Sequence, residues 1–212
     1  MALRAVIFDF GRVLSGPPEA AAQARMEELT GLSSERFKEF YWADRQAYDE
    51  GKFSGIGLWE KFLSDAGLRP NPALVAELNG LDARMWTQSD EQVLAWQQQL
   101  KSAGLLTAIL SNMGDAVEEK IVLELDWIER FDTCVWSHRL GFAKPDRRIY
   151  AHTLDLLGVP ANESLFIDDK QENIDAAVEI GMQAVLFTTM TELCKQLIAR
   201  GLDRELPMPM LP

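Results

Sequence analysis

The 212-residue sequence has few cysteines, only two histidines and no long apolar segment. Its cysteines, Cys134 and Cys194, lie far apart among apolar residues, so we expect two buried free thiols rather than a disulfide or a metal site. No apolar run approaches the length that spans a membrane. The first residues enter a predicted strand directly, so we expect no signal peptide and a cytoplasmic location.

Basic residues are also in the minority, with 21 Lys and Arg against 33 Asp and Glu, which gives a net charge of −12. A chain this acidic repels nucleic acid and anionic membranes, so we expect neither as its main partner. It also repels small anions unless a metal cation or a local basic group offsets the charge. With 47% hydrophobic and 25% charged residues, the composition is that of a soluble globular protein.

An apolar run from Ala5 to Phe8 ends in Asp9, and Gly11 follows two places later. Such a run predicts a strand that is buried on both faces, as in a parallel sheet. A carboxylate at its end would stand at the sheet edge where open α/β folds bind ligands. Asp9 alone is also consistent with a simple cap or turn residue.

After a Gly-Pro-Pro break, residues 19–86 have a helical pattern that predicts four helices, over 19–29, 33–49, 56–66 and from Asn71 onward. A helix over 89–103 follows. Predicted strands at 105–110, 133–136, 164–167 and 184–187 then alternate with helices, as in a parallel sheet with right-handed crossovers. We therefore predict an α/β fold with a Rossmann-like core domain, residues 1–14 and 87–212, and an inserted four-helix cap domain, residues 15–86. The Pro- and Met-rich tail, residues 206–212, is expected to be loose or to lie along the surface.

Polar residues follow three of the predicted core strands: Asp9, then Ser111 with Asn112, then Asp168 with Asp169, while Lys144 begins a helix between the last two groups. Strand ends of a parallel sheet share one edge, so these side chains can converge. Each also has an ordinary structural interpretation, as a helix cap or a surface lysine. The combination of all four in this order favours a common site.

Asp9 with one of Asp168 and Asp169 would form a carboxylate pair that requires a cation, and oxygen ligands of this kind suit Mg²⁺. Lys144 and Ser111 would supply a positive charge and a hydroxyl donor for a phosphate group. A phosphate held beside a free carboxylate favours in-line attack to give an aspartyl-phosphate, which water then hydrolyses.

The chain resembles the haloacid dehalogenase (HAD) superfamily of phosphatases over essentially its whole length. The motifs that carry the resemblance are Phe8-Asp9-Phe10-Gly11-Arg12-Val13-Leu14, Leu110-Ser111-Asn112, Gly141-Phe142-Ala143-Lys144-Pro145-Asp146 and Phe166-Ile167-Asp168-Asp169-Lys170-Gln171-Glu172-Asn173-Ile174. The position of the helical insert is similar to that in subfamily I, and the motif forms are similar to those of bacterial α-D-glucose-1-phosphate phosphatases.

The resemblance implies a role for each motif residue. Asp9 would be the nucleophile and a Mg²⁺ ligand, Ser111 a phosphate donor, and Lys144 a catalytic charge that also binds substrate. Asp169 would be the direct metal ligand with Asp168 in support. Asn112 would offer a backbone N–H to the phosphate.

Gly11 departs from the family pattern, which usually has a second aspartate there as general acid and base. Its backbone carbonyl can still bind metal, but no side chain can protonate the leaving group, a step worth about 10²–10⁴-fold. We therefore expect a small phosphorylated metabolite whose leaving group departs readily without protonation, such as a sugar 1-phosphate or an acyl phosphate. The alternatives are a haloacid dehalogenase, which needs neither metal nor the doubled aspartate, and a catalytically impaired HAD-fold binding protein.

Four residues close together in the predicted cap, Tyr41, Trp42, Arg45 and Tyr48, are either lid packing or a surface that closes over an organic leaving group. His138 and His152 have no partner pattern and are expected in ordinary structural positions. The sequence is compatible with a monomer or a homodimer.

Overall fold

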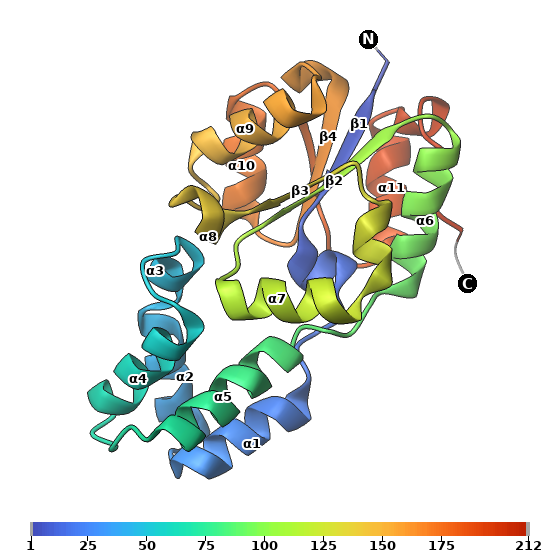
Figure 1. Cartoon of the computed structure of the whole chain (residues 1–212). Helices are drawn as coiled ribbons and strands as arrows, with labels where there is room; N and C mark the ends of the chain where they lie inside the picture. Colours follow the sequence, from blue (N-terminus) through green and yellow to red (C-terminus); the bar gives the residue numbers. More distant parts are fainter. Residues whose placement is uncertain (1, 211–212) are drawn as a thin grey trace.

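The computed structural model describes residues 2–210 and contains a five-stranded parallel sheet with the strand order β3-β2-β1-β4-β5 (Figure 1). The strands are β1 (Ala5–Phe8), β2 (Leu106–Ser111), β3 (Thr133–Trp136), β4 (Ser164–Asp168) and β5 (Gln183–Leu186). The central strand β1 pairs with β2 on one side and β4 on the other. The predicted α/β class is confirmed, and each strand lies within two residues of its predicted position.

Helices cover both faces of the sheet (Figure 1). Val6 and Phe8 of β1 face a hydrophobic cluster shared with α6 (Glu91–Ser102), α7 (Asp115–Glu124) and α11 (Met190–Ala199). Ala5 and Ile7 face a second cluster shared with α9 (Arg147–Leu157) and α10 (Gln171–Glu179). All four of these β1 side chains are fully buried, which explains why the sequence of β1 is continuously apolar rather than alternating.

Five helices lie between β1 and α6 and pack beside the sheet rather than on it (Figure 1). They are α1 (Ala20–Thr30), α2 (Ser34–Ala43), α3 (Arg45–Asp49), α4 (Gly55–Asp65) and α5 (Pro72–Arg84). We call them the helical insert. The insert has its own hydrophobic cluster, which includes Phe37, Trp59 and Leu78.

The single helix predicted over residues 33–49 is wrong, because the chain forms two helices there. Asp44 leaves the helical conformation with φ −113° and ψ 9°, and the chain restarts as α3. This break turns Arg45 into the interior of the insert, where it pairs with Asp82. A tertiary ion pair thus overrides the local helical pattern.

Several of the predicted helices begin with a side-chain cap. Ser33, Asn71 and Thr189 each accept a hydrogen bond from a backbone N–H three residues later. At α6 the cap is Asp90 rather than Ser89, whose hydroxyl instead accepts from the Trp127 indole at 2.8 Å.

The described part of the tail packs on the core. Trp96 on α6 donates its indole N–H to the Pro207 carbonyl at 2.7 Å, and Leu206 is buried. The last two residues of the predicted tail, 211 and 212, lie outside the described residues. Cys134 and Cys194 are both free thiols, half-buried and buried respectively. Within residues 2–210, no helix has the length and apolar character needed to cross a membrane.

The remaining α-helix among residues 2–210, α8 (Ser137–Leu140), follows β3 and was not predicted. It contacts the insert, since the Ser137 hydroxyl donates to the Asp49 carbonyl at 2.5 Å. The glycine at position 51 comes so close that a Cβ there would lie 2.3 Å from the His138 carbonyl oxygen. The tip of the insert is therefore docked against the core.

Candidate active site

Asp9 stands at the carboxyl end of β1, where the chain leaves the sheet in a tight turn over Phe10–Leu14. The Asp9 N–H donates to the Ile167 carbonyl at 2.8 Å, and its carboxylate Oδ1 accepts from the Phe10 N–H at 2.7 Å. Arg12 in this turn has a φ of 60°, the only positive φ outside glycine among residues 2–210. The turn fixes the direction of the Asp9 side chain.

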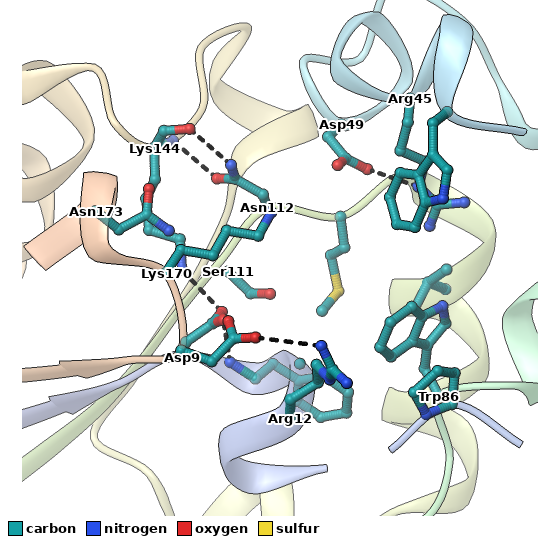
Figure 2. A pocket seen from close by; sticks show the side chains of 17 residues that line it. Asp9, Arg12, Arg45, Asp49, Trp86, Ser111, Asn112, Lys144, Lys170 and Asn173 are labelled. Carbon is teal, nitrogen blue, oxygen red and sulfur yellow. Dashed lines mark hydrogen bonds and ion pairs between the residues drawn. The ribbon is translucent and has the colours of Figure 1, made fainter. Parts of the chain in front are cut away.

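The carboxyl edge of the sheet and the helical insert enclose a cavity of about 260 Å³ (Figure 2). Six of the seven sequence-predicted site residues line it: Asp9, Gly11, Ser111, Asn112, Lys144 and Asp169. Asp168 lies behind them with no exposed surface. Segments that are more than 150 residues apart in the chain thus meet at one edge, as the parallel topology requires.

Lys144 is the buried centre of this arrangement, with a side chain that is 1% exposed. Its ammonium contacts Asp9 Oδ1 at 2.7 Å and Asp168 Oδ2 at 2.7 Å, and donates to the Leu110 carbonyl at 2.9 Å. Burial lowers the pKa of Lys144, but the charges of Asp168 and Asp9 outweigh burial and hold this pKa above its ordinary value. Lys144 is therefore a permanently charged group that links two carboxylates.

The pKa of Asp9, unlike that of Lys144, is shifted in the direction that disfavours the charged form. Burial raises its pKa to about 7, and the neighbouring Asp168 and Asp169 add to the rise, although the Lys144 ammonium opposes it. The ionised form of Asp9 is thus disfavoured, and the charge of one lysine does not offset burial and the neighbouring carboxylates. A second cation at this edge would favour the ionised form that a nucleophile needs.

Three carboxylates form an acidic cluster in which oxygens of Asp9, Asp168 and Asp169 lie within 4.8 Å of one another. Asp168 is already saturated, because its two oxygens accept from the Lys170 N–H, the Lys144 ammonium and the Asn173 side chain at 2.7–3.0 Å. Within residues 2–210, the Asp169 carboxylate has only a long contact to Arg12 at 4.0 Å. The two carboxylates with oxygens available to a metal ion are therefore Asp9 and Asp169, and Asp168 holds Lys144 in place.

Ser111 and Asn112 differ in what their side chains do. The Ser111 hydroxyl has no hydrogen-bond partner among the described residues, although the residue is 3% exposed, so it can donate to a ligand in the cavity. Asn112 instead donates to the Lys144 carbonyl and accepts from the Lys144 N–H, both at 2.8 Å. Its side chain therefore holds the backbone that carries Lys144 (Figure 2).

At Gly11 the cavity wall is formed by an indole. A Cβ at this position would lie 3.7 Å from Cζ3 of Trp86, which packs against the clusters of both the core and the insert. Trp86 was not singled out in the sequence. It follows α5 at the return from the insert, and nothing in its local pattern indicates that it reaches Gly11.

The insert contributes a polar network at the far side of the cavity. Arg45 donates to Asp82 Oδ2 at 2.8 Å and to the Tyr41 hydroxyl at 2.9 Å, while Tyr41 donates to Asp82 Oδ1 at 2.7 Å. Tyr41, Arg45 and Tyr48 are buried in the insert, so three of the four predicted lid residues serve packing, although Arg45 also reaches the cavity. Trp42 lines the cavity and is 57% exposed.

Asp49 is a cavity residue that sequence analysis missed (Figure 2). Its Oδ1 lies 3.4 Å from Arg45 Nε, and burial raises the pKa of Asp49 to about 6 despite that charge. The sequence places Asp49 at the end of a predicted helix, and that position does not indicate that its side chain lines a cavity. Of the two histidines, His138 contacts Glu118 at 2.5 Å, and neither lines the cavity.

The chain is similar over most of its length to known proteins. It is 26% identical over 197 residues to the sesquiterpene phosphatase astK of Aspergillus oryzae, covering 92% of this chain and 94% of that protein. It is 27% identical over 233 residues to bifunctional epoxide hydrolase 2 of Mus musculus, of which it spans 42%.

The fold is also found in solved structures. A HAD family enzyme from Bacteroides thetaiotaomicron, in complex with magnesium and inorganic phosphate, has a TM-score of 0.72 at 16% identity, covering 88% of this chain and 94% of that one. At this identity the likeness concerns the fold alone. The family model for haloacid dehalogenase-like hydrolases matches residues 3–181. The chain therefore belongs to the haloacid dehalogenase-like hydrolase family.

Proposed function

We propose that this hydrolase is a Mg²⁺-dependent phosphatase of small phosphorylated metabolites that acts through an aspartyl-phosphate on Asp9. The observation that carries the proposal is that an Asp169 oxygen lies within 4.8 Å of the Asp9 carboxylate, which the buried Lys144 ammonium contacts at 2.7 Å. This arrangement combines a nucleophile, a free metal ligand and a fixed positive charge at one edge. The relative named as a phosphatase supports the same reaction.

The donor set fits Mg²⁺. Asp9 and Asp169 offer carboxylate oxygens, and the Gly11 carbonyl lies in the same cavity wall, whereas Asp168 acts behind them through Lys144. Oxygen-only ligands and room for water suit this hard cation. When bound, the ion would neutralise phosphate oxygens and lower the cost of bringing a phosphate dianion to Asp9.

The residues of the chain then account for both chemical steps. The Asp9 carboxylate attacks phosphorus in line, the bond to the ester oxygen breaks, and that oxygen leaves with the electron pair. Lys144 and the free Ser111 hydroxyl stabilise the charge on the phosphoryl oxygens. Water then hydrolyses the acyl phosphate, which releases inorganic phosphate and restores Asp9.

Gly11 restricts the class of leaving group that the site is expected to favour. With no side chain there to protonate the departing oxygen, a leaving group that departs unprotonated is favoured, such as the anomeric oxygen of a sugar 1-phosphate. This is the preference expected for the glucose-1-phosphate phosphatase group of subfamily I that the motifs resemble. The helical insert, which walls the cavity with Trp42, Arg45 and Asp49, would serve as the cap domain over the leaving group.

Dehalogenation is the competing reaction on this fold, since it also uses the first aspartate as nucleophile. Dehalogenation needs no metal, so it assigns no role to the Asp169 carboxylate, whose oxygens are available to a metal ion. The site therefore favours the phosphatase. A non-catalytic binding protein is disfavoured because Asp9, Ser111 and Lys144 all remain in place around the cavity.

Hydrolysis of p-nitrophenyl phosphate with Mg²⁺ and with EDTA tests the proposal, beside halide release from 2-chloropropionate. We expect Mg²⁺-dependent phosphate release, its loss in Asp9→Asn, and no halide release. Halide release that is unaffected by EDTA, or full phosphatase activity in Asp9→Asn, would refute the proposal.

A further inference from the structure

The proposed chemistry leaves the insert side of the cavity unexplained. Asp49 and Trp42 both line it there, and neither takes part in holding or attacking phosphate. Figure 2 shows Asp49 and Arg45 on the opposite side of the cavity from Asp9. A phosphate placed at Asp9 would therefore direct its leaving group toward Asp49.

Asp49 has unsatisfied hydrogen-bonding capacity. Its side chain is 15% exposed, and neither carboxylate oxygen accepts a hydrogen bond within residues 2–210, although Arg45 Nε is 3.4 Å from Oδ1. The buried Oδ1 without a donor is costly, because it has lost water and gained only the 3.4 Å contact to Arg45. The position indicates a ligand that brings its own donor.

The structure also holds Asp49 in place before any ligand binds. Its backbone carbonyl accepts from Ser137, and Arg45 beside it is fixed by Asp82 and Tyr41. The Arg45 charge is thus shared between two carboxylates, so it neutralises Asp49 only in part. A rigid acceptor of this kind is typical of a recognition residue rather than a packing residue.

Trp42, like Asp49, is a residue of the helical insert that lines the cavity, and it supplies an apolar surface there. Trp42 is 57% exposed, and its ring packs edge-on against Tyr41 with ring centroids 5.0 Å apart. An aromatic face beside a hydrogen-bond acceptor matches a group that has both C–H faces and hydroxyls.

Two other leaving groups match less well. An ammonium group would suit an aromatic ring and a carboxylate, but the Arg45 guanidinium already lies 3.4 Å from the same Asp49 oxygen and would repel it. A purely apolar alcohol would cover the Asp49 carboxylate without giving it a donor.

We propose that Asp49 and Trp42 form a leaving-group subsite for an uncharged polyhydroxylated group such as a sugar, with a substrate hydroxyl donating to Asp49 and the C–H face lying on Trp42. This inference rests on the proposed phosphatase function. It makes Asp49 a specificity residue that is remote from the transferred phosphoryl group.

The test compares wild type with Asp49→Ala, Trp42→Ala and the neighbouring control Glu50→Gln, which removes a carboxylate outside the cavity. Each is assayed with Mg²⁺ on hexose 1-phosphates, phosphocholine, farnesyl phosphate and p-nitrophenyl phosphate. We expect wild type to prefer hexose phosphates over phosphocholine and farnesyl phosphate. In Asp49→Ala and Trp42→Ala, kcat/KM for hexose phosphates should fall at least about tenfold, mainly through KM. In Asp49→Ala, kcat/KM for p-nitrophenyl phosphate should change less than about threefold, because its leaving group has no hydroxyl to donate to Asp49.

Equal losses on sugar and p-nitrophenyl esters in Asp49→Ala, or no loss on sugar esters in either variant, would overturn the subsite, as would a wild-type preference for phosphocholine or farnesyl phosphate. Absence of all Mg²⁺-dependent hydrolysis in wild type would instead overturn the phosphatase function on which the subsite depends. Binding of hexose 1-phosphate to Asp9→Asn, followed by tryptophan fluorescence, gives a readout without turnover. Adding Asp49→Ala to that variant should weaken binding at least about tenfold, and unchanged binding would overturn the subsite.

Discussion

Lys144→Met should destabilise the protein strongly, because it leaves two buried carboxylates without their cation. Lys144 contacts Asp9 and Asp168 at 2.7 Å each, and its side chain is 1% exposed, so water cannot replace it. Removing one partner of a buried pair costs about 3–5 kcal/mol. Since 1 kcal/mol shifts the Tm of a protein this size by about 2–4 °C, we expect the Tm to fall by about 6–20 °C in EDTA.

Thermal unfolding of both proteins, with EDTA and with saturating Mg²⁺, measures the effect. Mg²⁺ should raise the Tm of Lys144→Met more than that of wild type, because it supplies part of the missing positive charge. Lys120→Met is the control, since Lys120 pairs with Glu124 on the surface and such pairs contribute about 0–1 kcal/mol. A Lys144→Met protein that unfolds within about 2 °C of wild type in EDTA would refute the reasoning.

Three further substitutions test the site and its surroundings. Asp9 has a pKa raised from 3.8 to about 7, so the folded state keeps a proton that the unfolded chain has lost, and metal-free wild type should lose stability as the pH rises from 5 to 7. In Asp9→Asn the loss of stability between pH 5 and 7 should be smaller. Identical profiles of Tm against pH for Asp9→Asn and wild type in EDTA would contradict this prediction. Gly11→Asp introduces the general acid that the family pattern usually has at this position. It should raise the ratio of kcat on glucose 6-phosphate to kcat on glucose 1-phosphate by up to about 10²-fold. An unchanged ratio would count against the argument that Gly11 selects a leaving group that departs unprotonated. Gly51→Ala places a Cβ 2.3 Å from the His138 carbonyl, so it should undock the insert tip and lower kcat/KM, whereas Gly67→Ala, also at positive φ but with open space, should affect only stability. Equal kinetics for the two glycine variants would show that the close contact is unimportant.

The sequence was sufficient to predict the residues that meet at the sheet edge. Asp9, Ser111 and Asp169 follow strands whose carboxyl ends must share one edge once the sheet is parallel, and Lys144 follows from its place between them. The continuous apolar run of β1 already implied burial on both faces. At these positions the local sequence pattern and the parallel topology predict the same placement of the side chains.

The insert side of the site was less predictable, because its contacts depend on tertiary packing. Arg45 turns inward to reach Asp82, which is 37 positions away, and this pairing splits the helix that periodicity alone joins together. Asp49 becomes a cavity residue only because α3 ends against Ser137. No sequence spacing connects these residues, so their positions emerge only from the assembled fold.

The chain leaves the core and returns to it at neighbouring points. Ser15 forms an isolated antiparallel bridge with Ser89, and the Gly16 N–H donates to the Gln88 carbonyl at 2.8 Å. A short turn can therefore join these two points if the intervening helices are removed or exchanged. Recombination between relatives at this junction would replace the helical insert, while the sheet and the helices that cover it keep their own sequence.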